Sequence, residues 1–184
     1  MQKLKKEREK MKKLYPNIYL KKVEDITIET LIKNKIKLLI LDVDNTLIDY
    51  YKNLSENIIK WAKEMKGQGI KLYILSNTNN EQKVEKVAQT LQIPYKHFAM
   101  KPLKRGFKKI EKETQIQAEN IAVVGDQIFT DVLGGNRSGM FTILVEPIDN
   151  KKDYWYTAWK RPIENKIKNK IKKETKEGKN KNVY

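Results

Sequence analysis

The sequence predicts an α/β fold: a doubly wound, Rossmann-like, mostly parallel sheet with helices on both faces. Two observations predict it. Short continuous apolar runs, typical of strands buried on both faces, alternate along the middle of the chain with amphipathic stretches of helical period. Several of these runs end in polar residues. Strands that alternate with helices in this way form parallel pairs joined by right-handed crossovers.

The first of the expected strands is "KLLILD", a continuous apolar run that ends in an aspartate. The predicted strands are residues 37–42, 71–77, 97–100, 120–126 and 140–147. The predicted helices between them are residues 55–69, 80–93, 103–116 and 130–139. The first of these helices begins at the N-cap residue Ser55 and stops at glycines, and the second is followed by Pro94.

The chain has 184 residues, the length of one domain with short tails. We expect a main domain over residues 14–160, a basic N-terminal arm over 1–13 and a basic C-terminal helix or tail over 161–184. The absence of cysteine excludes a disulfide framework and a cysteine-based zinc site. The first residues lack the apolar stretch of a signal peptide, and no apolar run approaches the roughly 20 residues that span a bilayer. We therefore expect a cytoplasmic protein, with any membrane contact peripheral and on the inner face.

The formal net charge of +16 is concentrated at the two ends of the chain. Residues 1–15 hold seven basic and two acidic side chains, and residues 160–184 hold ten basic and three acidic ones. Basic arms favour polyanionic partners, either nucleic acid or an anionic membrane surface. The alternative is that they only keep the protein soluble. Aromatic residues at 154–159 suit the headgroup zone of a membrane or, alternatively, cap the core beside the sheet.

Residues with functional side chains collect where the predicted strands end. In open α/β sheets, ligands bind at the carboxyl ends of the strands, so we expect these side chains to share one crevice. The set consists of Asp42, Asp44, Ser76, Asn77, Lys101 and Asp126. Clustered carboxylates repel one another without a cation, and hard oxygen ligands with room for water and phosphate suit Mg²⁺. A cation, a lysine and a hydroxyl around a carboxylate nucleophile predict a phosphoryl-transfer site.

Four short segments resemble, in order, the four motifs of the haloacid dehalogenase (HAD) superfamily of phosphatases. They are "DVDNT" (42–46), "LSN" (75–77), "KP" (101–102) and "GDQIFTD" (125–131). The resemblance implies a HAD-type fold over roughly the middle of the chain. It also implies that Asp42 attacks phosphorus and becomes an aspartyl phosphate. Asp44 would protonate the leaving alkoxide and then activate water for the second step.

The same resemblance implies the residues that bind phosphate. Thr46 would brace the catalytic loop on the phosphate-binding side. Ser76 and the backbone N–H of Asn77 would hold the phosphoryl oxygens. Lys101 would balance charge on the nucleophile and on the phosphoryl group.

For the metal, the resemblance implies Mg²⁺ held by Asp42, Asp126 and the carbonyl oxygen of Asp44. Asp131 would support the metal site or Lys101 through contacts with the surrounding side chains, without binding the metal itself. A non-catalytic phospho-acceptor binding module is an alternative, but the second carboxylate at Asp44 and the adjoining Thr46 disfavour it.

HAD enzymes usually gain specificity from a cap domain inserted between these motifs. Asp42 and Ser76 are 34 residues apart, and Ser76 and Lys101 are 25 residues apart, so neither interval can house a cap. We therefore predict a capless, open site, which favours a large substrate.

Two longer segments, residues 14–47 and 125–148, resemble the YqeG-type subgroup, which is related to the mitochondrial phosphatidylglycerophosphate phosphatases. The resemblance implies dephosphorylation of phosphatidylglycerophosphate to phosphatidylglycerol at an anionic membrane surface. A phosphatase acting on nucleic-acid ends, or on another large substrate, is the alternative, with the basic arms gripping backbone phosphates. The sequence does not predict the oligomeric state.

Overall fold

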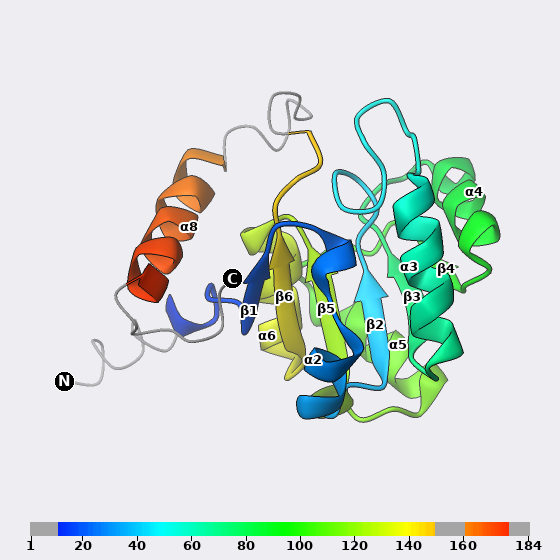
Figure 1. Cartoon of the computed structure of the whole chain (residues 1–184), viewed down its shortest axis with the longest axis horizontal. Coiled ribbons are helices and arrows are strands. Elements are labelled where there is room, and N and C mark those ends of the chain that lie inside the picture. Colours follow the sequence, from blue (N-terminus) through cyan, green and yellow to red (C-terminus); the bar gives the residue numbers. More distant parts are fainter. Residues whose placement is uncertain (1–10, 150–160, 177–184) are drawn as a thin grey trace.

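The computed structural model describes residues 11–149 and 161–176, and its centre is one sheet of six strands in the order β1-β6-β5-β2-β3-β4 (Figure 1). The strands are β1 (Ile18–Leu20), β2 (Leu38–Leu41), β3 (Lys71–Leu75), β4 (Tyr95–Lys96), β5 (Ile121–Gly125) and β6 (Phe141–Val145). All neighbouring strands pair in parallel. The predicted fold class, a doubly wound parallel α/β sheet, is therefore confirmed.

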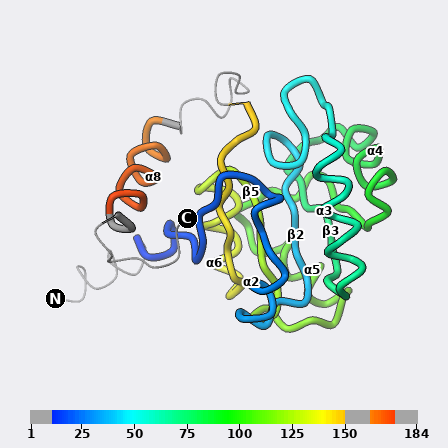
Figure 2. Tube along the Cα trace, viewed as in Figure 1, coloured from blue at the N-terminus to red at the C-terminus, as the bar shows by residue number. Residues whose placement is uncertain are grey.

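Helices cover both faces of the sheet, as the trace in Figure 2 also shows. They are α2 (Ile28–Lys33), α3 (Glu56–Gly67), α4 (Glu81–Leu91), α5 (Lys104–Thr114), α6 (Leu133–Ser138) and α8 (Arg161–Lys176), with short turns η1 (Val23–Asp25), η2 (Ala118–Asn120) and η3 (Ile128–Val132). Residues along β2 alternate between two cores because successive side chains of a strand point to opposite faces. Leu39 packs in the core shared by α3 and α4, and Ile40 packs in the core of α5.

The N-terminal ends of α3 and α4 are fixed by side-chain caps, of which the sequence predicted the one at Ser55. The Ser55 hydroxyl accepts a hydrogen bond from the Ile58 N–H (3.3 Å). The Asn80 side chain accepts one from the Lys83 N–H (3.0 Å). Each bond satisfies one of the amide donors that a helix leaves without an internal partner. The first turn of α4 is thus held at the carboxyl edge of the sheet, where the candidate site lies.

The strands β2, β3 and β5 end level with one another. Leu41 pairs with Ile74 on one side and with Val124 on the other. Asp42, Ser76 and Asp126 each follow shortly after these paired positions. The register therefore brings the polar residues of three motifs to one edge, as expected for an open parallel sheet.

One predicted strand is wrong. Residues 97–100 form no strand, and the edge strand β4 lies at Tyr95–Lys96 instead. Phe98 (φ 48°) and Met100 (φ 53°) adopt left-handed backbone conformations, which cannot continue a strand. Their apolar side chains resemble a strand in sequence, but both are exposed.

Other element boundaries differ less. The sequence did not predict β1, a three-residue strand that pairs with β6 at the far edge of the sheet. The helix predicted over residues 130–139 begins earlier, as the single π-turn η3, and continues as α6. Single π-turns of this kind, joined to an α-helix, often occur at functional sites.

The basic C-terminal segment forms the helix α8, whose buried face is partly polar. Of its isoleucines, Ile171 is buried and Ile163 is exposed. Glu164 and Lys168 are buried beside them. This face therefore contacts the protein through charged groups as well as through isoleucine. The predicted aromatic segment 154–159 and residues 1–10 of the basic arm lie outside the described residues.

Within residues 11–149 and 161–176, no helix is both long enough and apolar enough to cross a membrane. Between Asp42 and Ser76 lie the loop from β2 to α3, then α3 and β3. Between Ser76 and Lys101 lie α4 and β4. No cap domain occupies either interval, so the capless architecture is confirmed for these fully described stretches.

Candidate active site

The loop that follows β2 brings the first motif out of the sheet. The Asp42 N–H still pairs with the Val124 carbonyl (2.9 Å), so Asp42 is held in strand register. Asn45 then takes a left-handed conformation (φ 60°), which asparagine tolerates better than most residues. The Thr46 and Leu47 N–H groups bond back to the Val43 carbonyl. This reversal separates the side chains of Asp42 and Asp44, which are only two residues apart in the chain.

Asp42 belongs to a buried group of three charged side chains. The Lys101 ammonium donates to Asp42 Oδ1 (2.6 Å) and to Asp131 Oδ1 (2.7 Å). The three side chains are between 2% and 8% exposed, so water screens their charges poorly. Burial alone would lower the pKa of Lys101, but the carboxylates of Asp131 and Asp42 raise it above its ordinary value. Lys101 therefore stays protonated, and the group is a fixed ion cluster.

Lys101 is positioned through its backbone as well as its side chain. The Asn77 side chain accepts from the Lys101 N–H (2.6 Å) and donates to the Lys101 carbonyl (3.0 Å). These two hydrogen bonds tie the loop that follows β4 to the end of β3. Asn77 thus has a structural contact that the sequence did not predict, in addition to the backbone role expected for it.

Asp131 is positioned by the π-turn η3. Its Oδ2 accepts from the Gln127 N–H (3.3 Å) and from the Thr130 hydroxyl (3.1 Å). Burial raises the pKa of Asp131 to about 6, although the Lys101 ammonium opposes this rise. A Cβ at Gly125 would lie 2.3 Å from the Asp131 carboxyl carbon, so only glycine fits at the end of β5. Asp131 thus contacts Lys101, and its expected support of the metal site or of Lys101 stays a prediction.

Asp126 completes a cluster of carboxylates at this edge. It is fully buried, and the Thr46 hydroxyl lies 3.4 Å from its Oδ1. One carboxylate oxygen from each of Asp42, Asp126 and Asp131 lies within 4.8 Å of the others. Three buried carboxylates with hard oxygen atoms so close together fit a small divalent cation. Two of the expected ligands, Asp42 and Asp126, are in this set, and the third, the backbone carbonyl oxygen of Asp44, stays a prediction.

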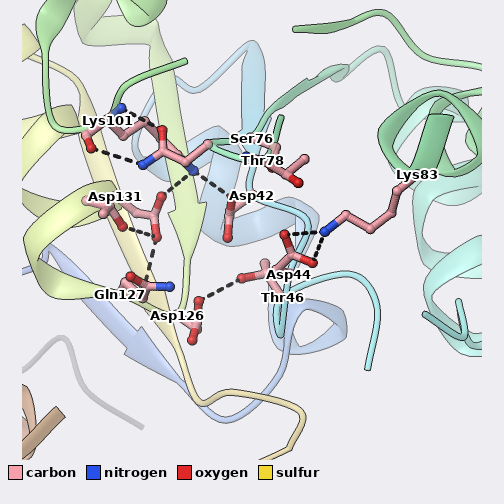
Figure 3. Close-up of polar contacts among 12 residues, drawn as sticks. Asp42, Asp44, Thr46, Ser76, Thr78, Lys83, Lys101, Asp126, Gln127 and Asp131 are labelled. Atoms are coloured by element: carbon pink, nitrogen blue, oxygen red, sulfur yellow. Dashed lines mark hydrogen bonds and ion pairs between the residues drawn. The ribbon is translucent and has the colours of Figure 1, made fainter. Parts of the chain in front are cut away.

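Asp44 lies at the rim of the site, outside the buried cluster, with its side chain 18% exposed, and it pairs with a different lysine. The Lys83 ammonium, from the first turn of α4, donates to Asp44 Oδ1 (2.5 Å) and Oδ2 (2.7 Å). Burial raises the pKa of Asp44, the hydrogen bond from Lys83 lowers it and the charge of Asp42 raises it, so that the net pKa lies above its ordinary value. Figure 3 shows Lys83 and Lys101 approaching the loop from opposite sides.

Ser76 lies directly after β3 and is almost fully buried. Its hydroxyl accepts from the Thr78 N–H (3.2 Å), and its carbonyl accepts from the Ala99 N–H (3.0 Å). These bonds hold the turn that follows β3 against the loop carrying Lys101. All the residues predicted from sequence are therefore brought to one edge of the sheet, and their roles in binding phosphate remain predictions.

Sequence reasoning missed two residues at this edge. Lys83 is one of 39 lysines and arginines, and nothing in its helical neighbours distinguishes it. Lys168, from α8, places its ammonium 3.3 Å from the Asp126 carbonyl oxygen and is buried. Both reach the site through tertiary packing, so no sequence spacing could have identified them.

Comparison with known proteins identifies the family. Residues 2–149 match the family model described as mitochondrial PGP phosphatase. The chain belongs to this family. It is 39% identical over 159 residues to "Probable phosphatase YqeG" of Bacillus subtilis (strain 168), covering 85% of this chain and 91% of that protein. It is 23% identical over 158 residues to "Phosphatidylglycerophosphate phosphatase 1, chloroplastic/mitochondrial" of Arabidopsis thaliana, covering 81% of this chain and 45% of that protein.

A solved structure supports the fold. An uncharacterized protein from Listeria monocytogenes serotype 4b superposes with a TM-score of 0.52 at 21% identity, over 64% of this chain and 85% of that one. The family match, the relatives and the four ordered motifs make this protein a phosphatase of the HAD superfamily, of the YqeG type.

Proposed function

We propose that this phosphatase removes the terminal phosphate of phosphatidylglycerophosphate, with Mg²⁺ as cofactor and an aspartyl phosphate as intermediate. The mechanism rests on one observation: the carboxylates of Asp42 and Asp44 lie in different surroundings. Asp42 is fixed in a buried ion cluster, and Asp44 lies at the rim with a raised pKa. A nucleophile needs fixed geometry, and a general acid needs a proton at working pH.

In the first step, a carboxylate oxygen of Asp42 forms a bond to phosphorus, and the bond from phosphorus to the ester oxygen breaks. Asp44 gives its proton to the departing alkoxide, which leaves as the alcohol. In the second step, Asp44 takes a proton from water. The water oxygen attacks phosphorus, and the bond from phosphorus to the Asp42 oxygen breaks. This step restores the Asp42 carboxylate and gives inorganic phosphate. The Lys101 ammonium, 2.6 Å from Asp42, stabilises the negative charge that the phosphoryl group brings.

Asp42 and Asp126 would hold Mg²⁺, and Asp131 would steady the site through Lys101. When bound, Mg²⁺ supplies positive charge against the phosphoryl oxygens and orients them. The fit rests on three buried carboxylates whose oxygens converge within 4.8 Å.

The lipid substrate is supported by the family description and by the name of the plant relative. The open architecture agrees with it, because no cap encloses the site in the described intervals. Exposed apolar side chains also lie on loops at the carboxyl edge of the sheet. They are Tyr50, Tyr51, Phe98, Met100, Leu103 and Ile148. Aromatic and apolar side chains beside a site for a lipid headgroup suit the interfacial zone of a bilayer.

The charge of the chain supports an anionic membrane surface as partner. The net charge is +16, and each lysine or arginine near such a surface contributes about 1 kcal/mol of binding. Deletion of residues 1–13 and 174–184 should weaken co-sedimentation with phosphatidylglycerol-rich vesicles and leave hydrolysis of a short soluble phosphomonoester unchanged. Equal pelleting of full-length and trimmed protein would mean that the arms do not bind membrane.

The decisive test compares substrates. Phosphate release should be measured from phosphatidylglycerophosphate in mixed micelles, from 5′- and 3′-phosphorylated oligonucleotides and from glycerol phosphate, with Mg²⁺ and with a chelator. We expect the lipid to be preferred and activity to require Mg²⁺. Preference for the oligonucleotides would replace the lipid with a nucleic-acid end. Full activity after chelation and dialysis would remove the metal from the mechanism.

A further inference from the structure

Asp44 is fully engaged in the structure described above. Both of its carboxylate oxygens accept from the Lys83 ammonium, at 2.5 and 2.7 Å. The Lys83 and Asp44 side chains are only 9% and 18% exposed, so water competes weakly for the pair. The Lys83 ammonium therefore occupies both oxygens of Asp44 with short, charge-assisted hydrogen bonds.

This contact conflicts with the work expected of Asp44. To protonate a leaving alkoxide, one oxygen of Asp44 must carry a proton and point at the ester oxygen. Neither oxygen is available for this while Lys83 bonds to both. Lys83 must therefore move away from Asp44 when a substrate is bound.

The rest of Lys83 is suited to such a movement. Its backbone is fixed, because the N–H donates to the Asn80 cap at the start of α4. Its side chain has a flexible four-carbon stem ending in three donors, so the ammonium can turn to another anion without any change in the helix. Figure 3 shows the side chain extending from α4 across the rim to Asp44.

We propose that Lys83 binds a second anionic group on the leaving-group side of the substrate, and that this anion draws Lys83 away from Asp44. The ligand class is a phosphomonoester whose alcohol carries another phosphate or phosphodiester a few bonds away. The inference deepens the proposed function, on which it rests for the identity of the substrate. In phosphatidylglycerophosphate, a glycerol of three carbons separates the monoester from the diester.

The proposal makes Lys83 a specificity residue. A substrate with the second anion gains a charge-assisted hydrogen bond and frees the general acid at the same time. A plain phosphomonoester lacks this anion, so Asp44 must break from Lys83 without compensation. The preference for two-anion substrates should therefore reside in one side chain.

The test uses matched soluble substrates and full-length enzyme with Mg²⁺. Propyl phosphate is compared with the bisphosphate of propane-1,3-diol, and glycerol phosphate with glycerophosphoglycerol phosphate, the deacylated lipid headgroup. The variants are Lys83→Met, which keeps the length of the side chain, and Lys83→Arg, which keeps its charge. The matched control is Lys86→Met, because Lys86 is an exposed lysine of the same helix.

For Lys83→Met, we expect kcat/KM on the two-anion substrates to fall about 10- to 100-fold, mainly through KM, as expected for loss of a hydrogen bond to an ionised group. The kcat on the plain monoesters should rise, because Asp44 no longer has to break from Lys83. Lys83→Arg should recover most of the preference, and Lys86→Met should match wild type. An equal fall on both classes would mean that Lys83 only positions Asp44, and no change on either class would mean that it has no role. Both outcomes overturn the proposal.

The two substrate pairs separate this inference from the lipid assignment. If Lys83 governs the preference for the propanediol bisphosphate but wild type does not hydrolyse glycerophosphoglycerol phosphate, the lipid assignment fails and the role of Lys83 stands. If wild type prefers the lipid headgroup and Lys83→Met keeps that preference, the lipid assignment stands and the role of Lys83 fails.

Discussion

The two lysine–carboxylate contacts at the edge of the sheet differ in how firmly the fold holds them. The cluster of Asp42, Lys101 and Asp131 joins the end of β2, the loop after β4 and the turn η3, and its side chains are only 2% to 8% exposed. The pair of Asp44 and Lys83 joins a loop to one flexible side chain at the rim. Moving any member of the cluster would leave a buried charge unpaired, whereas Lys83 can exchange partners.

In the proposed mechanism, this difference lets one loop serve two chemical roles. Asp42, the proposed nucleophile, is held by a buried ion cluster, which is the kind of preorganisation that stabilises a transition state. Asp44, the proposed acid–base residue, lies at the more exposed edge of the site. The following experiments break or sharpen this contrast, from the largest expected effect to the smallest.

Asp42→Asn should reduce turnover by about 10⁴-fold or more, because the nucleophile loses its charge with almost no change of shape. The fold should remain, since Lys101 keeps its bond to Asp131 (2.7 Å). Steady-state phosphate release and near-ultraviolet circular dichroism check the two halves of this prediction. Wild-type hydrolysis by Asp42→Asn in the presence of Mg²⁺ would rule out the covalent mechanism.

Asp44→Asn should slow both chemical steps by about 10²–10⁴-fold, the usual contribution of general acid–base catalysis. The buried cluster should be unaffected, because Asp44 contacts Lys83 and not Lys101. Rapid quench followed by mass spectrometry should detect phosphate accumulating on Asp42. A rate equal to wild type from pH 5 to 8 would contradict the role of Asp44.

Lys101→Met should lower the free energy of unfolding by about 3–5 kcal/mol, because two buried carboxylates lose their shared cation. Lys83→Met should cost less than half as much, since Asp44 can still reach water. Urea denaturation without metal measures both, and adding Asp131→Asn to Lys101→Met should recover part of the loss. Equal costs for the two lysines would erase the contrast between the cluster and the pair.

Gly125→Ala should lower the free energy of unfolding by about 1–3 kcal/mol, because the new Cβ would lie 2.3 Å from the Asp131 carboxyl carbon and force it to move. Turnover should fall with it, since Asp131 holds Lys101 against Asp42. Gly67→Ala is the control: Gly67 ends α3, and a Cβ there meets nothing within 4 Å. Similar stability of the two variants in thermal unfolding would contradict the close packing at Gly125.

The smallest effect concerns the docking of α8, whose Lys172 pairs with Glu146 and whose Lys168 bonds to the Asp126 carbonyl oxygen. Burial would raise the pKa of Glu146, but hydrogen bonds from Lys172 and Tyr19 lower it, to a net value below its ordinary 4.5. A carboxyl whose pKa is lowered by folding stabilises the fold above its unfolded pKa, and this stabilisation is lost as the pH falls through the folded pKa. We therefore expect α8 to loosen below about pH 4.5, at a cost of less than about 1 kcal/mol.

Amide chemical shifts of residues 164–173, followed by NMR from pH 7 to pH 3, measure this loosening. The Glu146→Gln variant should show shifts that no longer respond to pH in this range. Shifts of wild type and variant that move together would assign the change to another group.

The sequence predicted most of the polar side chains at the carboxyl edge of the sheet, because the motifs that carry them directly follow strands. The apolar run of β2 places Asp42 at its end, and parallel register then brings Ser76 and Asp126 to the same level. The edge strand was misplaced to residues 97–100, because apolar side chains are typical of strands whether or not they are buried. In the structure, Phe98 and Met100 are exposed and left-handed, and the strand is formed by Tyr95 and Lys96.

The amino-acid sequence alone determined the fold class, the order of the motifs, the absence of room for a cap and the identity of the clustered carboxylates. These properties depend on local pattern and on spacing along the chain. The contact of Lys101 with Asp42 was expected, but only the tertiary structure decided that Lys83 meets Asp44 and that Lys168 meets the Asp126 carbonyl. Lys83 and Lys168 lie 39 and 42 residues from the groups they contact, and their neighbours in sequence are ordinary helical residues. Long side chains reach across elements, so their partners are set by how helices pack on the sheet.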